Sequence, residues 1–486
     1  MKRVVVLSLT AVILISLVAA LMIISPPQQS NGNEFYVGVT YCGESIADAQ
    51  RLVDKVKNYT NLFVVQSGPL MADGLAIEEI GDYAVTKGLH FAVFFDTSQV
   101  PEKAIWLQHA TTRWGNMFSG VYYADEPGGK LLDTQLTFLD TTGDVINKMP
   151  DGTIQTLKPY FLMFFPNGTI GAQKSNNTYT DIEYADPVNF SLRSEIIYSP
   201  DGTTTIFDQI DEHIQSPEYS SKRISETFYT PQNGSERIVE EETYLQVQKY
   251  NPVPNVDVAA DLFISKTSKP LNDFIDYWNL SQRSYPMFTA DYGLYWWDYK
   301  AGYDTILAEL GWNNSINQEI GLVRGAASAM HKDWGTILTW KYMQPPYLCS
   351  GDEMYHQLKT SYQTGAKYTL IFNYAQNMST PYGILQDQHF EALERFWNDV
   401  VENPQEVQGS IRAETAFVLP KNFGWGLRNP QDKIFGIWQP TEQDNQTWTN
   451  LQAALTKHDL KLDIIYDDPT HPITGRYQQT IHGNQR

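Results

Sequence analysis

The chain has 486 residues, of which 42% are hydrophobic and 19% charged, and its formal net charge is −21. This is the composition of a globular protein with a large core, which excludes global disorder. The negative charge repels phosphate backbones, so no nucleic-acid partner is expected. With only Cys42 and Cys349, a disulfide scaffold and a cysteine-based zinc site are excluded, although the two can pair in an oxidising compartment.

The N-terminus carries a candidate membrane segment. Lys2 and Arg3 precede an uncharged, mostly apolar stretch from Val4 to Ser25. A bilayer core needs roughly 20 such residues, and no clear small-residue cleavage site follows. We expect residues 1–33 to form a signal anchor and a tether, with a cleaved signal peptide as the alternative. The positive residues stay inside, so the rest of the chain is expected at the cell surface, or secreted after cleavage.

N-x-[ST] sequons support export. The chain has nine of them, whereas chance gives roughly three or four, which favours a glycosylated surface protein. The candidate glycosylation sites are Asn58, Asn167, Asn176, Asn189, Asn233, Asn279, Asn313, Asn377 and Asn445.

Apolar runs alternate with amphipathic stretches from residue 34 onward. Nearly continuous apolar runs are typical of parallel strands that are buried on both faces. Strands are predicted at 35–41, 61–66, 90–95 and 119–123, and helices at 45–59, 76–86 and 101–114.

Residues 128–256 have a different pattern. Pro-Asp-Gly-Thr or Pro-Asn-Gly-Thr occurs at 150–153, 166–169 and 200–203, and Asn233-Gly234 is a fourth turn signal. Glycine takes the positive φ that such turns require. The pattern predicts a β-rich insertion, which can serve as a lid, a cleft wall, a binding module or a decoration without chemistry.

The β-α alternation then returns. The pattern predicts four further strands, at 287–290, 305–310, 335–340 and 367–372, and helices at 256–278, 318–331, 352–363 and 389–401. Residues 305–310 are also compatible with a helix. Eight units within residues 34–405 predict an α/β fold, a TIM (β/α)8 barrel interrupted by the insertion after strand 4. Two strands, at 416–419 and 461–466, and a helix at 448–457 predict a small α/β C-terminal domain over residues 406–486.

Active sites of such barrels lie at the C-terminal ends of the strands. These ends carry acids, amides and aromatic rings, and the chain has no nucleophilic serine motif, phosphate loop or metal-ligating histidine spacing. No metal or cofactor is therefore expected. Carboxylates beside aromatic rings favour glycoside hydrolysis, in which one carboxylic acid protonates the leaving oxygen and a second carboxylate attacks carbon or activates water.

The sequence at 121–127, VYYADEP, resembles the end of the fourth strand in (β/α)8 glycoside hydrolases. Many of these enzymes have Asn-Glu-Pro there, with the Glu as acid/base. The resemblance covers the barrel rhythm and this tripeptide, with Asp125 in place of the Asn, and it implies a catalytic Glu126. It fails at strand 7, where the family has a nucleophilic Glu and residues 339–342 (TWKY) offer no carboxylate.

Other barrel glycosidases pair acids from strands 4 and 6. Glu309 suits that arrangement, with Asp125 or Glu126 opposite, and Asp291 after strand 5 is a further catalytic candidate. Each has a structural alternative: Asp125 and Glu126 can simply start a turn, and Glu309 is solvent-exposed if its segment is a helix. Asp291 can instead be a hydrogen-bond acceptor at the mouth of the barrel.

Aromatic and polar residues at the strand ends are candidates for binding a sugar, although Trp296 and Trp297 also suit a core. The substrate-binding candidates are Tyr41, Asp96, Tyr292, Trp296, Trp297, Trp340, Tyr342 and Asn373. The leading hypothesis is an extracellular glycoside hydrolase that cleaves an oligo- or polysaccharide with paired carboxylates. The alternative is a non-catalytic surface glycoprotein that binds carbohydrate or serves as an envelope component.

Overall fold

The computed structural model describes residues 34–71, 74–96, 104–134, 255–312, 314–374, 380–472 and 475–483, together with the backbone of nine strands between residues 143 and 247. The predicted anchor at residues 1–33 lies outside the described residues. No helix within the described ranges is both long enough and apolar enough to cross a membrane.

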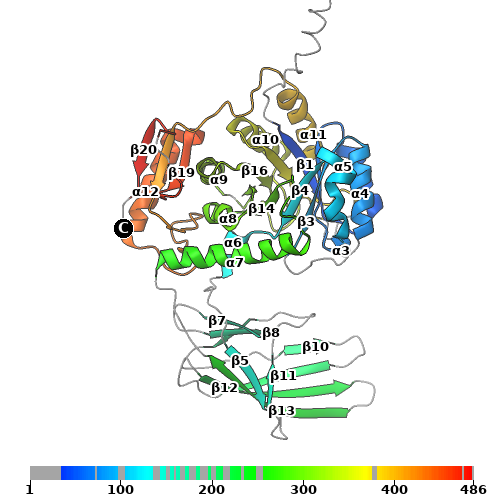
Figure 1. Cartoon of the computed structure of the whole chain (residues 1–486), viewed down its shortest axis with the longest axis vertical. Helices are drawn as coiled ribbons and strands as arrows, with labels where there is room; N and C mark the ends of the chain where they lie inside the picture. The colour runs from blue at the N-terminus through cyan, green and yellow to red at the C-terminus, as the bar shows by residue number, and fades with distance from the viewer. Residues whose placement is uncertain are drawn as a thin grey trace, which may run out of the picture. The chain divides into compact units, whose positions relative to one another are not determined.

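Eight parallel strands form a closed barrel in the order β1-β17-β16-β15-β14-β4-β3-β2, which confirms the predicted TIM barrel (Figure 1). Every predicted barrel strand overlaps an observed one, and residues 305–310 are a strand rather than a helix. The strands are β1 (Tyr36–Tyr41), β2 (Leu62–Val65), β3 (His90–Phe95), β4 (Phe118–Tyr123), β14 (Met287–Asp291), β15 (Thr305–Leu310), β16 (Asp333–Leu338) and β17 (Tyr368–Ile371).

Burial on both faces explains the apolar strand sequences. All residues of β2, β4, β14, β15 and β17 are buried. Glycine is required where backbones approach most closely: a Cβ on Gly38 would stand 1.9 Å from Leu62 O of the neighbouring strand. The barrel therefore has a packed interior, as such barrels generally do.

Helices surround the barrel (Figure 1). Serine side chains cap the first turns of α2 and α10, and Gly365 ends α10 in the left-handed region. The helices are α2 (Ile46–Val56), α3 (Gly68–Met71), α4 (Gly74–Thr86), α5 (Ala110–Trp114), α6 (Pro127–Thr134), α7 (Val256–Tyr277), α8 (Tyr295–Ala301), α9 (Ile316–Met330), α10 (Gly351–Thr364) and α11 (Asp387–Phe396).

Several barrel elements differ from the sequence prediction, including the unpredicted four-residue helix α3. The helix expected at 101–114 is described from Ala104, as a 3₁₀ turn (Ala104–His109) followed by α5. Two short helices, α6 and α8, begin directly after the ends of β4 and β14 and were not predicted. Both are too short to show a helical period, so the hydrophobic pattern does not reveal them.

The insertion contains two antiparallel sheets, with strand orders β10-β11-β12-β13-β5-β6 and β7-β8-β9. Each of the four predicted turns falls between two strands that pair antiparallel: β5/β6, β7/β8, β10/β11 and β12/β13. The strands are β5 (Gly143–Lys148), β6 (Ile154–Leu157), β7 (Tyr160–Phe164), β8 (Ile170–Lys174), β9 (Ile182–Ala185), β10 (Glu195–Tyr198), β11 (Thr204–Asp211), β12 (Tyr219–Thr230) and β13 (Ser235–Val247).

The C-terminal residues form a parallel sheet of β18 (Thr415–Leu419), β19 (Leu462–Tyr466) and β20 (Gln479–His482), with helix α12 (Glu442–His458). Only β20 was missed, because its exposed residues give no apolar run. Barrel helix α9 packs closely on β19, since a Cβ on Gly325 would stand 2.6 Å from Ile464 O.

A buried ion pair fixes this contact. Arg324 on α9 donates from Nε to Asp463 Oδ1 on β19 (2.7 Å) and from Nη2 to the carbonyl oxygen of Leu460 (2.7 Å). Tyr477 Oη donates to the other oxygen of Asp463 (2.8 Å). Both charged side chains are nearly inaccessible, with exposed fractions of 9% and 3%.

Removal of Arg324 is expected to destabilise the protein. Arg324→Ala leaves the Asp463 carboxylate buried without its cation, which costs about 3–5 kcal/mol for pairs of this kind. Arg412 is exposed, so Arg412→Ala is the matched control and is expected to change stability by no more than about 0.5 kcal/mol. Urea unfolding of both variants measures the difference, and similar midpoints would contradict the structural role of the pair.

Candidate active site

A cavity of about 190 Å³ opens at the C-terminal ends of the barrel strands. It combines three carboxyl groups with aromatic and apolar side chains. Its lining consists of Gln66, Tyr122, Asp125, Glu126, Glu309, Trp312, Ile337, Thr339, Trp340 and Phe372. Three of the four predicted catalytic acids therefore meet in one place, although they come from two segments more than 180 residues apart in the sequence.

Glu309 is the most deeply buried acid of this cavity, with an exposed fraction of 5%. It projects from β15, the sixth barrel strand. Burial, and then the negative charges of Glu126, Asp125 and Asp291, raise its pKa well above the usual range, and its side chain hydrogen-bonds to Glu126. Burial and like charge therefore both favour the neutral, protonated form of Glu309.

Glu126 is more accessible than Glu309. Its side chain is 26% exposed, and Lys130 Nζ lies 3.7 Å from its Oε2 atom. The same lysine donates to the carbonyl oxygen of Asp125 (2.8 Å). One cation thus stabilises a turn that carries two adjacent acids.

Asp125 faces Tyr122 inside the cavity. Tyr122 Oη donates a short hydrogen bond to Asp125 Oδ1. Burial and the charge of Glu126 raise the pKa of Asp125 to about 6, while Lys130 and the Tyr122 hydrogen bond oppose the rise. Like charges in a buried site cannot all ionise together, and this separates the protonation states of the three acids.

The backbone of the turn is unusual. Ala124 and Glu126 have positive φ values of 56° and 53°, a region that non-glycine residues rarely adopt. Ala124 N donates to Phe95 O and Glu126 N to Ala290 O, each at 2.9 Å. The turn is therefore attached to both strands that neighbour β4, and backbone strain held in this way is concentrated at functional sites.

Asp291, the fourth catalytic candidate, does not line the cavity. It is fully buried and accepts hydrogen bonds from the backbone N–H groups of Gly128 (2.6 Å), Gly129 (2.7 Å), Tyr292 (2.7 Å) and Gly293 (3.2 Å). Asp291 therefore anchors the start of α6, which directly follows Glu126, and acts as a positioning residue.

A second buried acid, Asp298 on α8, faces Asp291. Burial and the Asp291 charge raise the pKa of Asp298 well above the usual range, and burial raises that of Asp291 to about 7. Neither carboxyl oxygen of Asp298 has a donor within the described residues, whereas Asp291 has four backbone donors, so Asp298 is the member that the site favours in the protonated form. Two negative charges in this dry site would repel, and the shared proton removes that repulsion.

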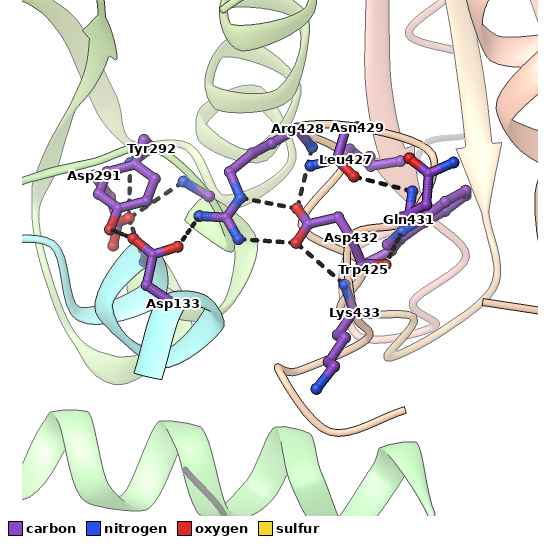
Figure 2. Close-up of polar contacts among 12 residues, drawn as sticks. Asp133, Asp291, Tyr292, Trp425, Leu427, Arg428, Asn429, Gln431, Asp432 and Lys433 are labelled. Atoms are coloured by element: carbon purple, nitrogen blue, oxygen red, sulfur yellow. Dashed lines mark hydrogen bonds and ion pairs between the residues drawn. The ribbon is translucent and has the colours of Figure 1, made fainter. Parts of the chain in front are cut away.

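Figure 2 shows how the far end of α6 is attached. Tyr292 Oη donates to Asp133 Oδ2 (2.6 Å), and Arg428 from the C-terminal region donates to Asp133 Oδ1. Arg428 also makes two hydrogen bonds to Asp432, of 2.9 and 2.8 Å, and lies over the Tyr292 ring. The C-terminal region thus fixes α6, the helix that follows the turn at residues 124–126.

Five of the predicted substrate-binding residues differ in which cavity they line. Tyr41 and Asn373 line a second, neighbouring cavity, whereas Trp340 lines the first. Asp96 and Tyr342 line neither of these cavities.

Trp296 and Trp297 correct the sequence interpretation. Their exposed fractions are 2% and 0%, and both indoles pack against Tyr466 of β19, with ring centroids 5.3 and 4.7 Å away. Helix α8 turns them toward the C-terminal sheet, so they form core and not a sugar platform. Tyr292 is likewise a structural residue beneath α6, where its ring would be 2.2 Å from a Cβ on Gly129.

Several cavity residues were not selected from the sequence. Gln66 directly follows β2 and Thr339 directly follows β16, so their position at strand ends was the available signal. Phe372 directly follows β17, and Trp312 is the second residue after the end of β15. Polar side chains at strand ends are common, however, and only the tertiary structure shows which of them face the cavity.

The structure also bears on the suggested disulfide, the sequons and metal binding. Cys42 and Cys349 are free and do not form the suggested disulfide; burial raises the pKa of each thiol to about 12. Asn58, Asn279 and Asn445 are exposed, as glycosylation requires, and the other six sequon asparagines lie outside the described residues. No group of three or more His, Cys, Asp or Glu within the described ranges is arranged to hold a metal ion.

Comparisons with known proteins give a similarity of fold. No family model matches the chain, and no curated protein matches its sequence. A β-galactosidase from the psychrophilic Marinomonas ef1 aligns over 92% of this chain and 72% of its own, with 9% identity and a TM-score of 0.46. At that level the similarity says nothing about the substrate or the catalytic residues of this chain.

The Asp291 anchor gives a paired prediction. An amide at Asp291 has one acceptor oxygen and turns an NH₂ group toward backbone donors, so Asp291→Asn is expected to cost about 1–3 kcal/mol. Asp298→Asn keeps a donor toward Asp291 and is expected to cost less than about 1 kcal/mol. Urea unfolding, with amide exchange at Gly128 and Gly129, measures both variants, and equal losses would refute the assignment of the proton to Asp298.

Protonation of Glu309 can be observed directly. Infrared spectra at neutral pH are expected to contain a carboxylic-acid C=O band that Glu309→Gln removes and that disappears as the pH rises through the raised pKa of Glu309. Glu391 is exposed on α11, so Glu391→Gln is expected to leave the band unchanged. A wild-type spectrum identical to that of Glu309→Gln would show that Glu309 is ionised.

Proposed function

We propose that the chain is a glycoside hydrolase in which Glu309 donates the proton and Glu126 is the carboxylate. The observation that carries this proposal is the placing of two acids of unequal burial, Glu309 and Glu126, in one cavity bordered by Trp312 and Trp340, where burial raises the pKa of Glu309. Glycoside hydrolysis requires one carboxylic acid and one carboxylate on either side of the scissile bond.

The geometry supports a division of roles. Glu309 sits in a buried strand, and its raised pKa keeps it protonated at neutral pH, as a general acid must be. It would protonate the glycosidic oxygen while the bond to the anomeric carbon breaks. Glu126 would either attack that carbon or take a proton from an attacking water. Asp125 and Tyr122 form the wall beside them.

Glu126 and Glu309 line the same small cavity, and the Glu126 side chain acts directly on the pKa of Glu309. Retaining enzymes separate such groups by about 5–5.5 Å and inverting enzymes by about 6.5–9.5 Å. A sugar between them must therefore displace the more exposed Glu126 side chain, because β15 holds the backbone of Glu309. Lys130, 3.7 Å from Glu126, would stabilise its charge during that movement.

We further propose that the protein acts outside the cell. This rests on the apolar segment at residues 4–25 and on the nine sequons. The three sequon asparagines within the described ranges are exposed, which supports the same location. The non-catalytic, carbohydrate-binding alternative fits the same features and is separated from hydrolysis by the experiment below.

The test compares Glu309→Gln and Glu126→Gln of the full chain on a panel of natural glycans and on dinitrophenyl glycosides. Both variants are expected to lower kcat/KM on natural glycans by about 10²–10⁴-fold. Glu309→Gln is expected to lose far less on dinitrophenyl glycosides, because that leaving group needs no proton. Product stereochemistry by NMR then distinguishes nucleophile from base.

Glu391→Gln is the matched control and is expected to retain wild-type rates. Equal losses of both variants on both substrate types would overturn the assigned roles. Binding of glycans without hydrolysis by any protein would favour the non-catalytic alternative.

A further inference from the structure

The catalytic cavity alone is too small for a glycan chain. Its volume of about 190 Å³ lies below the range of about 300–1,000 Å³ that is typical of ligand pockets. A second cavity of about 470 Å³ opens at the ends of β1, β2 and β17. Gln66 lines both cavities, so they adjoin, and together they fall within that range.

A row of neighbouring aromatic rings extends from the catalytic cavity to the second cavity. The Trp340 ring lies 6.2 Å from Trp312, 6.5 Å from Phe372 and 5.4 Å from Tyr374, measured between ring centroids. Trp312, Trp340 and Phe372 line the catalytic cavity, and Tyr374 lines the second. Such rings offer successive flat apolar surfaces, on which the apolar faces of sugar rings pack.

Buried polar atoms around the junction have no partner within the described residues. These are Gln66 Oε1, Thr339 Oγ1 and Trp340 Nε1, which include an acceptor, a donor and a hydroxyl. Unpaired buried polar atoms are costly, and a polar occupant that shifts the side chains at the junction would satisfy them. Sugar hydroxyls donate and accept and therefore suit all three.

The charges that line both cavities are negative. Besides Glu309, whose raised pKa favours its neutral form, the catalytic cavity has Asp125 and Glu126, the second has Glu44 and Asp48, and no Lys or Arg belongs to either lining. A uronate, sulfate or phosphate group would meet like charge there without a counter-ion. The lining therefore disfavours an anionic occupant.

We infer that the substrate is a neutral oligosaccharide of several sugar units, bound across both cavities, with Tyr374 and Gln66 holding units beyond the bond that is cleaved. This deepens the proposed function and rests on it. The second cavity makes chain length, rather than a single terminal sugar, the feature that the protein recognises.

The experiment uses the full chain with neutral oligosaccharides of two to six units and with their uronate counterparts. Wild-type kcat/KM is expected to rise about tenfold or more from the shortest to the longer neutral chains, as one or two additional favourable contacts give. Tyr374→Ala is expected to bring this ratio close to one, and Tyr374→Phe to keep it, because the ring remains. Uronate chains are expected to be poor substrates at every length.

Gln446→Ala, which alters an exposed residue of α12, is the control and should keep the wild-type ratio. Hydrolysis of neutral glycans with no dependence on length, or a preference for uronates, would overturn this inference while leaving the proposed function intact. Length-dependent binding to Glu309→Gln by calorimetry, without hydrolysis by wild type, would refute the hydrolase and support the binding cleft. Tyr374→Ala with a wild-type ratio and wild-type thermal stability would exclude the second cavity.

Discussion

The Asp291 carboxylate is the contact on which the geometry of the site depends. It accepts hydrogen bonds from four backbone N–H groups, two at its own strand end and two at the start of α6. Burial of a carboxylate is costly, and these charge-assisted hydrogen bonds offset the cost. Because α6 begins directly after Glu126, the anchor fixes the turn that carries Asp125 and Glu126. The proton on Asp298 makes this possible by removing a neighbouring charge.

The same electrostatic rule operates twice within the barrel mouth. In two pairs of acids, Asp291 with Asp298 and Glu126 with Glu309, burial and like charge raise the pKa of one member well above its usual range. The consequences differ because of access. The first pair is sealed beneath α6 and has a structural role, whereas the second borders a cavity in which its proton can reach a substrate. Position in the fold, and not residue type, separates positioning from chemistry.

The C-terminal sheet is integrated with the barrel. Arg324 and Asp463 join α9 to β19. Trp297 of α8 packs against Phe435 and Tyr466 of the C-terminal region. Arg428 then reaches α6 through Asp133, as Figure 2 shows. These contacts hold the helices behind the turn at residues 124–126, which keeps Asp125 and Glu126 in place. The C-terminal region therefore supports the candidate site without contributing a residue to its cavity lining.

The sequence by itself determined the barrel, because strands buried on both faces leave apolar runs that local inspection detects. It also placed Glu126 and Glu309 at the mouth, since the C-terminal ends of parallel strands meet at one edge of a barrel. Only the tertiary structure decided the rest: that α8 turns Trp296 and Trp297 into the core, and that Asp291 anchors a helix. It also showed that Gln66 lines two adjoining cavities and that the Trp340 ring of the first lies beside the Tyr374 ring of the second. These outcomes depend on contacts between residues far apart in the chain, such as Asp291 with Gly128, and no local pattern encodes which polar or aromatic side chain will find such a partner.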